Sequence, residues 1–169
     1  FPTMEKQARR IASWGNNVSV KIPITNTKGE SATSLIRMLS ADGVSVNVTA
    51  IMTEAQVEAV TDALSPDTSA IVSVFAGRIA DTGRDPVPVM QRCKDILSGK
   101  PKAQLLWASP REVLNLFQAD AVGCEIITMT DDLLKKLAGT GKNLDTFSLE
   151  TVKMFFDDAT SAGYDIAVD

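Results

Sequence analysis

The sequence predicts an α/β protein built around a parallel sheet, and two observations carry that prediction. Stretches rich in valine and isoleucine alternate with amphipathic helical stretches along the chain, which is typical of right-handed βαβ units. The first two strand-like stretches also keep polar residues on one face. At 169 residues, of which 44% are hydrophobic, the chain is long enough for the single domain that we expect over residues 1–169.

The strand at Asn17–Thr27 has the clearest pattern. Valine or isoleucine occupies every second position from Val18 to Ile24, so Lys21 lies in the middle of the opposite, polar face. A lysine on a surface strand would look the same in isolation. The interpretation of Lys21 therefore depends on the rest of the chain.

The strand at Val44–Ile51 repeats this pattern. Strict alternation places Ala50 with the valines on the apolar face, and Ile51 with Asn47 and Thr49 on the polar face. Helical spacing, turn residues and prolines near helix starts define the other elements. We expect helices at 2–14, 31–41, 54–64, 86–97, 110–118, 131–137 and 148–161, and further strands at 70–76, 103–108 and 124–128.

Composition excludes several classes of function. The net charge of −4, without clustered Lys or Arg, argues against nucleic acid, and no apolar stretch reaches the ~20 residues of a membrane span. Cys93 and Cys124 lack metal-ligand spacing and are interpreted as reduced thiols of a cytoplasmic protein. The chain has no histidine, so we expect no metal site, and catalysis must rest on lysine, carboxylates, hydroxyls or tyrosine.

Two architectures fit alternating strands and helices. The strands of a doubly wound sheet are usually apolar on both faces, whereas polar faces suit strands that line the interior of a barrel. A closed β/α barrel needs eight strands and usually ~200 residues or more. Five predicted strands cannot close one, so the barrel interpretation implies that the front of the barrel precedes Phe1 or comes from another polypeptide.

Residues able to do chemistry gather at the predicted strand ends, where β/α barrels place their active sites. A buried lysine among hydroxyls suits Schiff-base formation with a carbonyl substrate, because burial favours the neutral, nucleophilic amine. Arginines suit an anion such as phosphate. Taken singly, each hydroxyl also fits a hydrogen-bonded strand end, and Arg78 a surface ion pair. The candidates are Lys21, Asn47, Thr49, Ser73, Arg78, Ser109 and Arg111.

Five ordered motifs cover nearly the whole chain: NVSVKIPIT, VNVTAIMTEAQ, IVSVFAGRIADTG, LLWASPRE and GCEIITMTDDLLKKL. In this order they resemble the transaldolases, most closely the small bacterial transaldolase-like proteins that include the fructose-6-phosphate aldolases. The resemblance implies a (β/α)8 TIM barrel, sugar-phosphate substrates and a class I aldol mechanism with no cofactor. This chain would supply about five C-terminal βα units of that barrel and a C-terminal helix.

The resemblance also implies roles for single residues. Lys21 looks like the Schiff-base lysine and Thr49 like the residue that holds the catalytic water. Asn47 resembles a contact to substrate hydroxyls, and Ser73 a contact to the hydroxyl end of the sugar. These four residues come from three successive predicted strands.

The later motifs imply the remaining substrate contacts. Arg78, Ser109 and Arg111 resemble the family's phosphate-binding group. Phe75 stands where fructose-6-phosphate aldolases have a catalytic tyrosine and transaldolases a phenylalanine, which favours transaldolase activity. Val74 replaces a proline common in this motif. The carboxylate and amide groups of the family's first three strands would precede the first residue of this chain.

We therefore predict a Schiff-base transaldolase of the pentose phosphate pathway that transfers a dihydroxyacetone unit between sugar phosphates. Two alternatives stay open: aldolase-type cleavage of fructose 6-phosphate, and a non-catalytic barrel fragment that serves as an assembly or binding module. The last helix, 148–161, carries an apolar stripe that includes Val152 and Phe155. It would either pack on the core or, as the corresponding helix does in the small relatives, reach a neighbouring subunit of a ring-like homo-oligomer.

Overall fold

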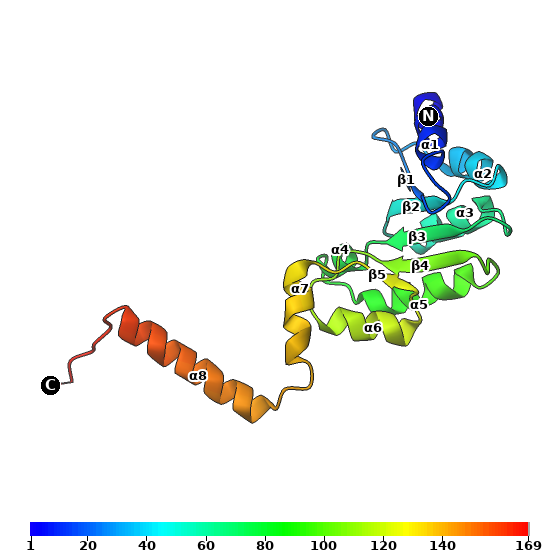
Figure 1. Cartoon of the computed structure of the whole chain (residues 1–169). Coiled ribbons are helices and arrows are strands. Elements are labelled where there is room, and N and C mark those ends of the chain that lie inside the picture. Colours follow the sequence, from blue (N-terminus) through cyan, green and yellow to red (C-terminus); the bar gives the residue numbers. More distant parts are fainter. Residues whose placement is uncertain (169) are drawn as a thin grey trace. The chain divides into compact units, whose positions relative to one another are not determined.

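The computed structural model describes residues 1–168 (Figure 1). The chain divides into two compact units, Phe1–Leu133 and Leu134–Asp169, which are described separately. The elements in chain order are α1 (Pro2–Ala12), β1 (Val20–Pro23), α2 (Thr33–Ala41), β2 (Val46–Ile51), α3 (Glu54–Ala63), β3 (Ala70–Val74), α4 (Ala76–Ala80), α5 (Pro86–Leu97), β4 (Ala103–Trp107), α6 (Leu114–Val122), β5 (Ile126–Ile127), α7 (Asp131–Lys136), the 3₁₀ helix η1 (Leu137–Gly139) and α8 (Leu144–Ser161).

The sheet of the first unit has the strand order of a barrel wall. Its five strands are all parallel and pair in chain order, β1-β2-β3-β4-β5, as Figure 1 shows. The helices contact one another in the same order, α1 with α2, α2 with α3, α3 with α5 and α5 with α6. A doubly wound sheet would reverse its strand order and carry helices on both faces. The chain is therefore an α/β protein with the topology of part of a TIM barrel.

The two faces of the sheet differ in chemistry. The helix-facing side forms the core, with alternate strand residues and helix residues such as Ile36 and Met90 fully buried. The opposite face carries the intervening residues, and the register aligns one residue from each of the first four strands across it. These four aligned residues are Lys21, Asn47, Ile71 and Gln104.

The alternation predicted for the end of β2 is wrong. Ala50 has a φ of 63° and is exposed, whereas Ile51 is fully buried. The pairing of β2 with β3 shifts between Val48 and Ile51, so one extra residue interrupts the strand as a β-bulge. Burial of the isoleucine side chain offsets the backbone strain at Ala50.

Some predicted boundaries also differ from the structure. The strand predicted at 70–76 ends at Val74, and α4 follows it. Only five residues long, α4 is too short for a helical periodicity to appear in the sequence. The strand predicted at 124–128 is reduced to the two residues of β5.

The helix predicted at 110–118 lies at Leu114–Val122 instead. Asn115 Oδ1 accepts hydrogen bonds from the backbone N–H groups of Arg111 and Glu112, which holds these residues in a turn before the helix. Gly123 ends the helix with a φ of 81°, a conformation that glycine adopts without a steric penalty. The proline expected to open the helix therefore precedes it.

The second unit is dominated by α8, which begins at Leu144 where the sequence predicted residue 148. Asn143 caps it, because its Oδ1 accepts from the backbone N–H of Thr146 at 3.0 Å. Among the described residues of this helix, no side chain is buried, and Phe155 and Phe156 are 63% and 70% exposed. Within residues 1–168, a helix both long and apolar enough to cross a bilayer is absent.

Gly77 joins α4 to the end of β4. A Cβ atom at this position would stand 1.5 Å from the carbonyl oxygen of Ser109, and Gly77 N donates to Ala108 O at 3.2 Å. Backbone therefore touches backbone at this point. Any larger residue would push α4 away from the loop that follows β4.

We predict that Gly77→Ala lowers the free energy of unfolding by about 2 kcal/mol or more, because the added methyl group overlaps a backbone atom that cannot move independently. Urea denaturation followed by circular dichroism measures this change. Gly99→Ala is the matched control, since no described atom lies within 4 Å of its added Cβ. Equal stabilities for the two variants would contradict the prediction.

Candidate functional site

Three of the predicted site residues lie side by side on the face opposite the helices. Lys21 and Asn47 are direct partners in the parallel register of β1 and β2. Ser73 on β3 is 2% exposed, and its Oγ donates to Asn47 Oδ1 at 2.7 Å. The sheet thus brings an amine, an amide and a hydroxyl together from three consecutive strands.

Lys21 is exposed, so the burial predicted for this side chain is wrong for this chain. The reason is its position: β1 is the first strand of the sheet, and within residues 1–168 no strand pairs with its outer edge. A cavity of about 90 Å³ lies between α1 and β1, lined by Lys21 with Met4, Gln7 and Val20. The amine is therefore accessible to small solutes at the sheet edge.

Thr49 carries a buried hydroxyl that none of residues 1–168 satisfies. Its Oγ1 is removed from solvent and lacks a hydrogen-bond partner among them. A buried polar atom without a partner is uncommon and often marks a place for a water or a ligand. The next residue, Ala50, has the strained φ of the bulge. An unpartnered buried hydroxyl and a strained backbone therefore lie next to each other at the end of β2.

Arg78 and Phe75 form a contact at the end of β3. The guanidinium carbon of Arg78 lies 5.4 Å from the centroid of the Phe75 ring, within the range of a cation–π interaction. Arg78 is exposed, and the close approach of its neighbour Gly77 to Ser109 brings α4 against the loop after β4. The predicted residues Arg78 and Ser109 thus belong to adjoining backbone segments.

Ser109 has a φ of 59°, which is unusual for a residue other than glycine. Its backbone N–H donates to Thr128 Oγ1 at 3.3 Å, which ties the end of β4 to the residue after β5. Together, Ala50 and Ser109 are the two non-glycine residues with positive φ within the described chain. Ala50 directly follows the predicted site residue Thr49, and Ser109 is itself a predicted site residue, and backbone strain often accompanies function.

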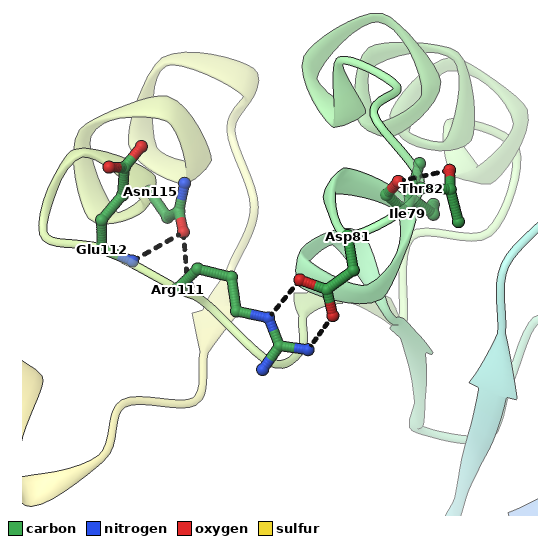
Figure 2. Close-up of polar contacts among 6 residues, drawn as sticks. All are labelled: Ile79, Asp81, Thr82, Arg111, Glu112 and Asn115. Carbon is green, nitrogen blue, oxygen red and sulfur yellow. Dashed lines mark hydrogen bonds and ion pairs between the residues drawn. The ribbon is translucent and has the colours of Figure 1, made fainter.

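Arg111 is held by an acid that sequence reasoning did not select. Its Nε donates to Asp81 Oδ1 at 3.0 Å, and its Nη2 donates to Asp81 Oδ2, as Figure 2 shows. Its backbone N–H donates to Asn115 Oδ1 at 2.7 Å. Asp81 lies outside every helix and strand that the sequence predicts, and Asn115 lies within the helix predicted at 110–118. Asp81 and Arg111 are separated by thirty positions in the sequence, so no local pattern signals their pairing.

The two thiols are poor nucleophiles. Burial raises the pKa of Cys93 to about 12, assisted by the negative charge of Glu54. Burial also raises the pKa of Cys124 to about 12, helped by Glu125 and opposed by Lys94. A thiol with so high a pKa carries almost no thiolate at neutral pH. Within residues 1–168, no cluster of three or more acidic or cysteine side chains is arranged to hold a metal ion.

Glu125 connects β4 to α5. Burial acts to raise the pKa of its carboxyl, but hydrogen bonds from the Lys94 ammonium and the Leu105 N–H outweigh burial, so the pKa falls below its usual value. This carboxylate therefore stabilises the fold above its unfolded pKa, and the contribution is lost as the pH falls through the lowered value. The role is structural, on the helix side of the sheet.

The polar face, the strained strand ends and the paired arginine define the class: a wall of a β/α barrel with an amine, an amide, hydroxyls and guanidiniums at its carboxyl-terminal edge. Residues 1–167 match the model of the family described as transaldolase/fructose-6-phosphate aldolase. The chain belongs to this family.

Curated relatives agree with this membership. A probable transaldolase of Nitrosopumilus maritimus (strain SCM1) is 32% identical over 140 residues, which cover 81% of this chain and 59% of that protein. A probable transaldolase 2 of Listeria monocytogenes serovar 1/2a is 33% identical (79% and 58%), and a probable transaldolase of Streptococcus equi subsp. equi is 34% identical (88% and 65%). The chain therefore spans about three fifths of the length of these relatives.

Comparison with solved structures also finds distant likenesses. A solved native KDPGal structure aligns with a TM-score of 0.31 and 11% sequence identity, covering 86% of this chain and 83% of that one. A likeness at this level supports no conclusion about the site.

We predict that Thr49→Val leaves the free energy of unfolding within about 0.5 kcal/mol of the parent, because no hydrogen bond to a described residue is lost and an apolar group suits a buried position. Ser73→Ala is the control. It removes the bond to Asn47 and should cost about 1 kcal/mol. Urea unfolding compares the two, and a larger loss for Thr49→Val would mean that this hydroxyl is structural.

Proposed function

We propose that the protein catalyses Schiff-base transaldolase chemistry, with Lys21 as the nucleophile and a ketose phosphate as the donor. The observation that carries this proposal is the contiguous set of Lys21, Asn47 and Ser73 on one sheet face, in a chain that belongs to the transaldolase/fructose-6-phosphate aldolase family. Because the chain spans about three fifths of its relatives, the activity is proposed for the protein with a complete barrel.

The chemistry follows from an amine at this position. The neutral amine of Lys21 adds to the ketose carbonyl to give a carbinolamine, which loses water to become an imine. The imine draws electrons from the bond between its α- and β-carbons. As the hydroxyl on the β-carbon gives its proton to water, this bond breaks, an aldose phosphate leaves as the aldehyde, and an enamine remains on Lys21. The enamine then attacks the carbonyl carbon of an acceptor aldose phosphate, and water hydrolyses the new imine. The imine is itself the electron sink, so the proposed reaction requires no metal and no organic cofactor.

The other predicted residues take supporting roles in this proposal. Thr49 holds the water used in imine formation and hydrolysis, which suits its unpartnered hydroxyl. Asn47 and Ser73 contact the hydroxyl groups of the dihydroxyacetone unit. Arg78, Ser109 and Arg111 bind the substrate phosphate. The Phe75 ring packs against the guanidinium of Arg78. We further propose a cytoplasmic role in the pentose phosphate pathway.

A second candidate function is a non-catalytic barrel wall that serves as an assembly or binding module. The open edge of β1 and the exposed Lys21 favour it. A free aldolase that releases dihydroxyacetone is the remaining enzymatic alternative, and Phe75 in place of a tyrosine counts against it. The reactivity of Lys21 separates the catalytic candidates from the module.

We predict that borohydride reduction in the presence of dihydroxyacetone or fructose 6-phosphate adds one substrate fragment to the chain, located on Lys21 by peptide mass spectrometry. Lys21→Met should abolish this adduct, because no imine can form at that position. Lys28→Met, in the exposed loop after β1, should keep it. Equal labelling of the parent and Lys21→Met would refute the catalytic proposal and would favour the non-catalytic assembly or binding module.

We also propose that α8 mediates a ring-like homo-oligomer, since its unit buries none of the described apolar side chains of this helix. Light scattering coupled to size-exclusion chromatography should report several chains per particle. Phe155→Asp should reduce the particle mass by placing a charge in the apolar stripe of Leu149, Val152, Phe155 and Phe156. Asp157→Lys also changes the charge but is not three or four residues from any of these, so this control should keep the particle mass. A monomeric parent would contradict this assembly.

A further inference from the structure

The ion pair between Asp81 and Arg111 fixes the orientation of a guanidinium. Asp81 lies at the C-terminal end of α4, and Arg111 lies in the turn that precedes α6. Nε and Nη2 of the arginine donate to the two carboxylate oxygens, so two parallel hydrogen bonds hold the planar group (Figure 2). A forked pair of this kind restricts rotation more than a single contact does.

The backbone end of the Arg111 side chain is fixed as well. Asn115 is 7% exposed, and its Oδ1 accepts from the backbone N–H groups of Arg111 at 2.7 Å and of Glu112 at 3.2 Å. Its Nδ2 donates to Gln118 Oε1 at 2.9 Å, which sets the orientation of the amide. The backbone and the guanidinium of Arg111 are therefore both held.

Part of the guanidinium stays free for a ligand. Nη1 of Arg111 makes no hydrogen bond to any of residues 1–168, and the side chain is 47% exposed. The same loop carries Ser109, against which Gly77 packs, and Arg78 follows Gly77 directly. An anion bound at this edge of the sheet could accept a hydrogen bond from Nη1 of Arg111, whose guanidinium is already fixed by Asp81.

Stability does not account for this ion pair. The side chain of Asp81 is 52% exposed and the side chain of Arg111 is 47% exposed. Ion pairs between exposed side chains contribute little to the free energy of folding. We propose that Asp81 is a positioning residue: it holds the Arg111 guanidinium in the orientation that binds the phosphate group of a phosphate monoester. This inference rests on the proposed function only in taking Arg111 as a ligand of the substrate phosphate.

Because Asp81 is negatively charged, its orienting effect and its charge predict opposite changes in phosphate affinity when the charge is removed. A negative charge next to an anion site repels the anion, so electrostatics alone predict that its removal strengthens phosphate binding. Positioning predicts the opposite, because a freely rotating Arg111 forms a poorer hydrogen bond with phosphate. The direction of the change therefore distinguishes a residue that orients Arg111 from one that merely neutralises it.

The experiment titrates the full chain with inorganic phosphate and with fructose 6-phosphate, and follows the Arg111 Nε–H signal by ¹⁵N NMR. Asp81→Asn should raise both dissociation constants roughly tenfold and move the free Nε–H signal toward that of a solvated arginine. Asp81→Glu should restore most of the affinity.

Glu112→Gln is the charge-matched control. It removes the same charge from the residue next to Arg111. The Glu112 side chain forms no hydrogen bond or ion pair with another described residue. This variant should bind phosphate as well as the parent does or slightly better. Urea midpoints for all three variants should equal that of the parent.

Unchanged or tighter phosphate binding by Asp81→Asn would overturn the inference, and so would a parent chain that does not bind phosphate. Unfolding of Asp81→Asn would show that the pair is structural and would overturn it too. The Lys21 adduct with dihydroxyacetone, which carries no phosphate, tests the proposed function separately. A chain that forms no adduct but responds to Asp81→Asn as described would refute the catalysis and retain the positioning role.

Discussion

The parallel register of β1, β2 and β3 is the constraint on which the rest of the structure depends. It keeps the valine residues of these strands on the helix side, where they form part of the core. The same register leaves Lys21 beside Asn47 and lets Ser73 reach that amide from the next strand. A shift by one residue would exchange the two faces and bury the lysine among the helices. Core packing and the arrangement of the candidate site therefore have one cause.

The carboxyl-terminal edge of the sheet is assembled by backbone contacts as well as by side chains. The bulge at Ala50 directs Ile51 into the core, and Ser109 adopts a positive φ where its carbonyl meets Gly77. These features bring α4 and the loop after β4 together, and the pair of Asp81 with Arg111 joins the same two segments. Strain and close packing are concentrated where the candidate ligands lie, and the opposite end of the sheet carries structural ion pairs such as Lys94 with Glu125.

The sheet has two edges that no strand of residues 1–168 covers, those of β1 and β5. An uncovered edge presents unpaired N–H and C=O groups that can pair with another strand. The exposure of Lys21 follows from its place on such an edge, and a covering strand would change the environment of the amine. A strand paired with the edge of β1 would therefore alter the reactivity of the Lys21 amine.

The sequence by itself determined the α/β class, the five strands, and the polar face of the first two strands, which carries Lys21, Asn47 and Thr49. Local periodicity encodes these features, because side chains alternate with a period of two on a strand. The ordered motifs also indicated the family. Only the tertiary structure decided the faces of Ala50 and Ile51, the start of α6 at Leu114, the exposure of Lys21 and the pairing of Asp81 with Arg111. The bulge, the exposure of Lys21 and the pair of Asp81 with Arg111 depend on the pairing of segments far apart in the chain, which no local pattern records. The start of α6 depends on local hydrogen bonds to the Asn115 side chain, whose orientation helical periodicity does not record.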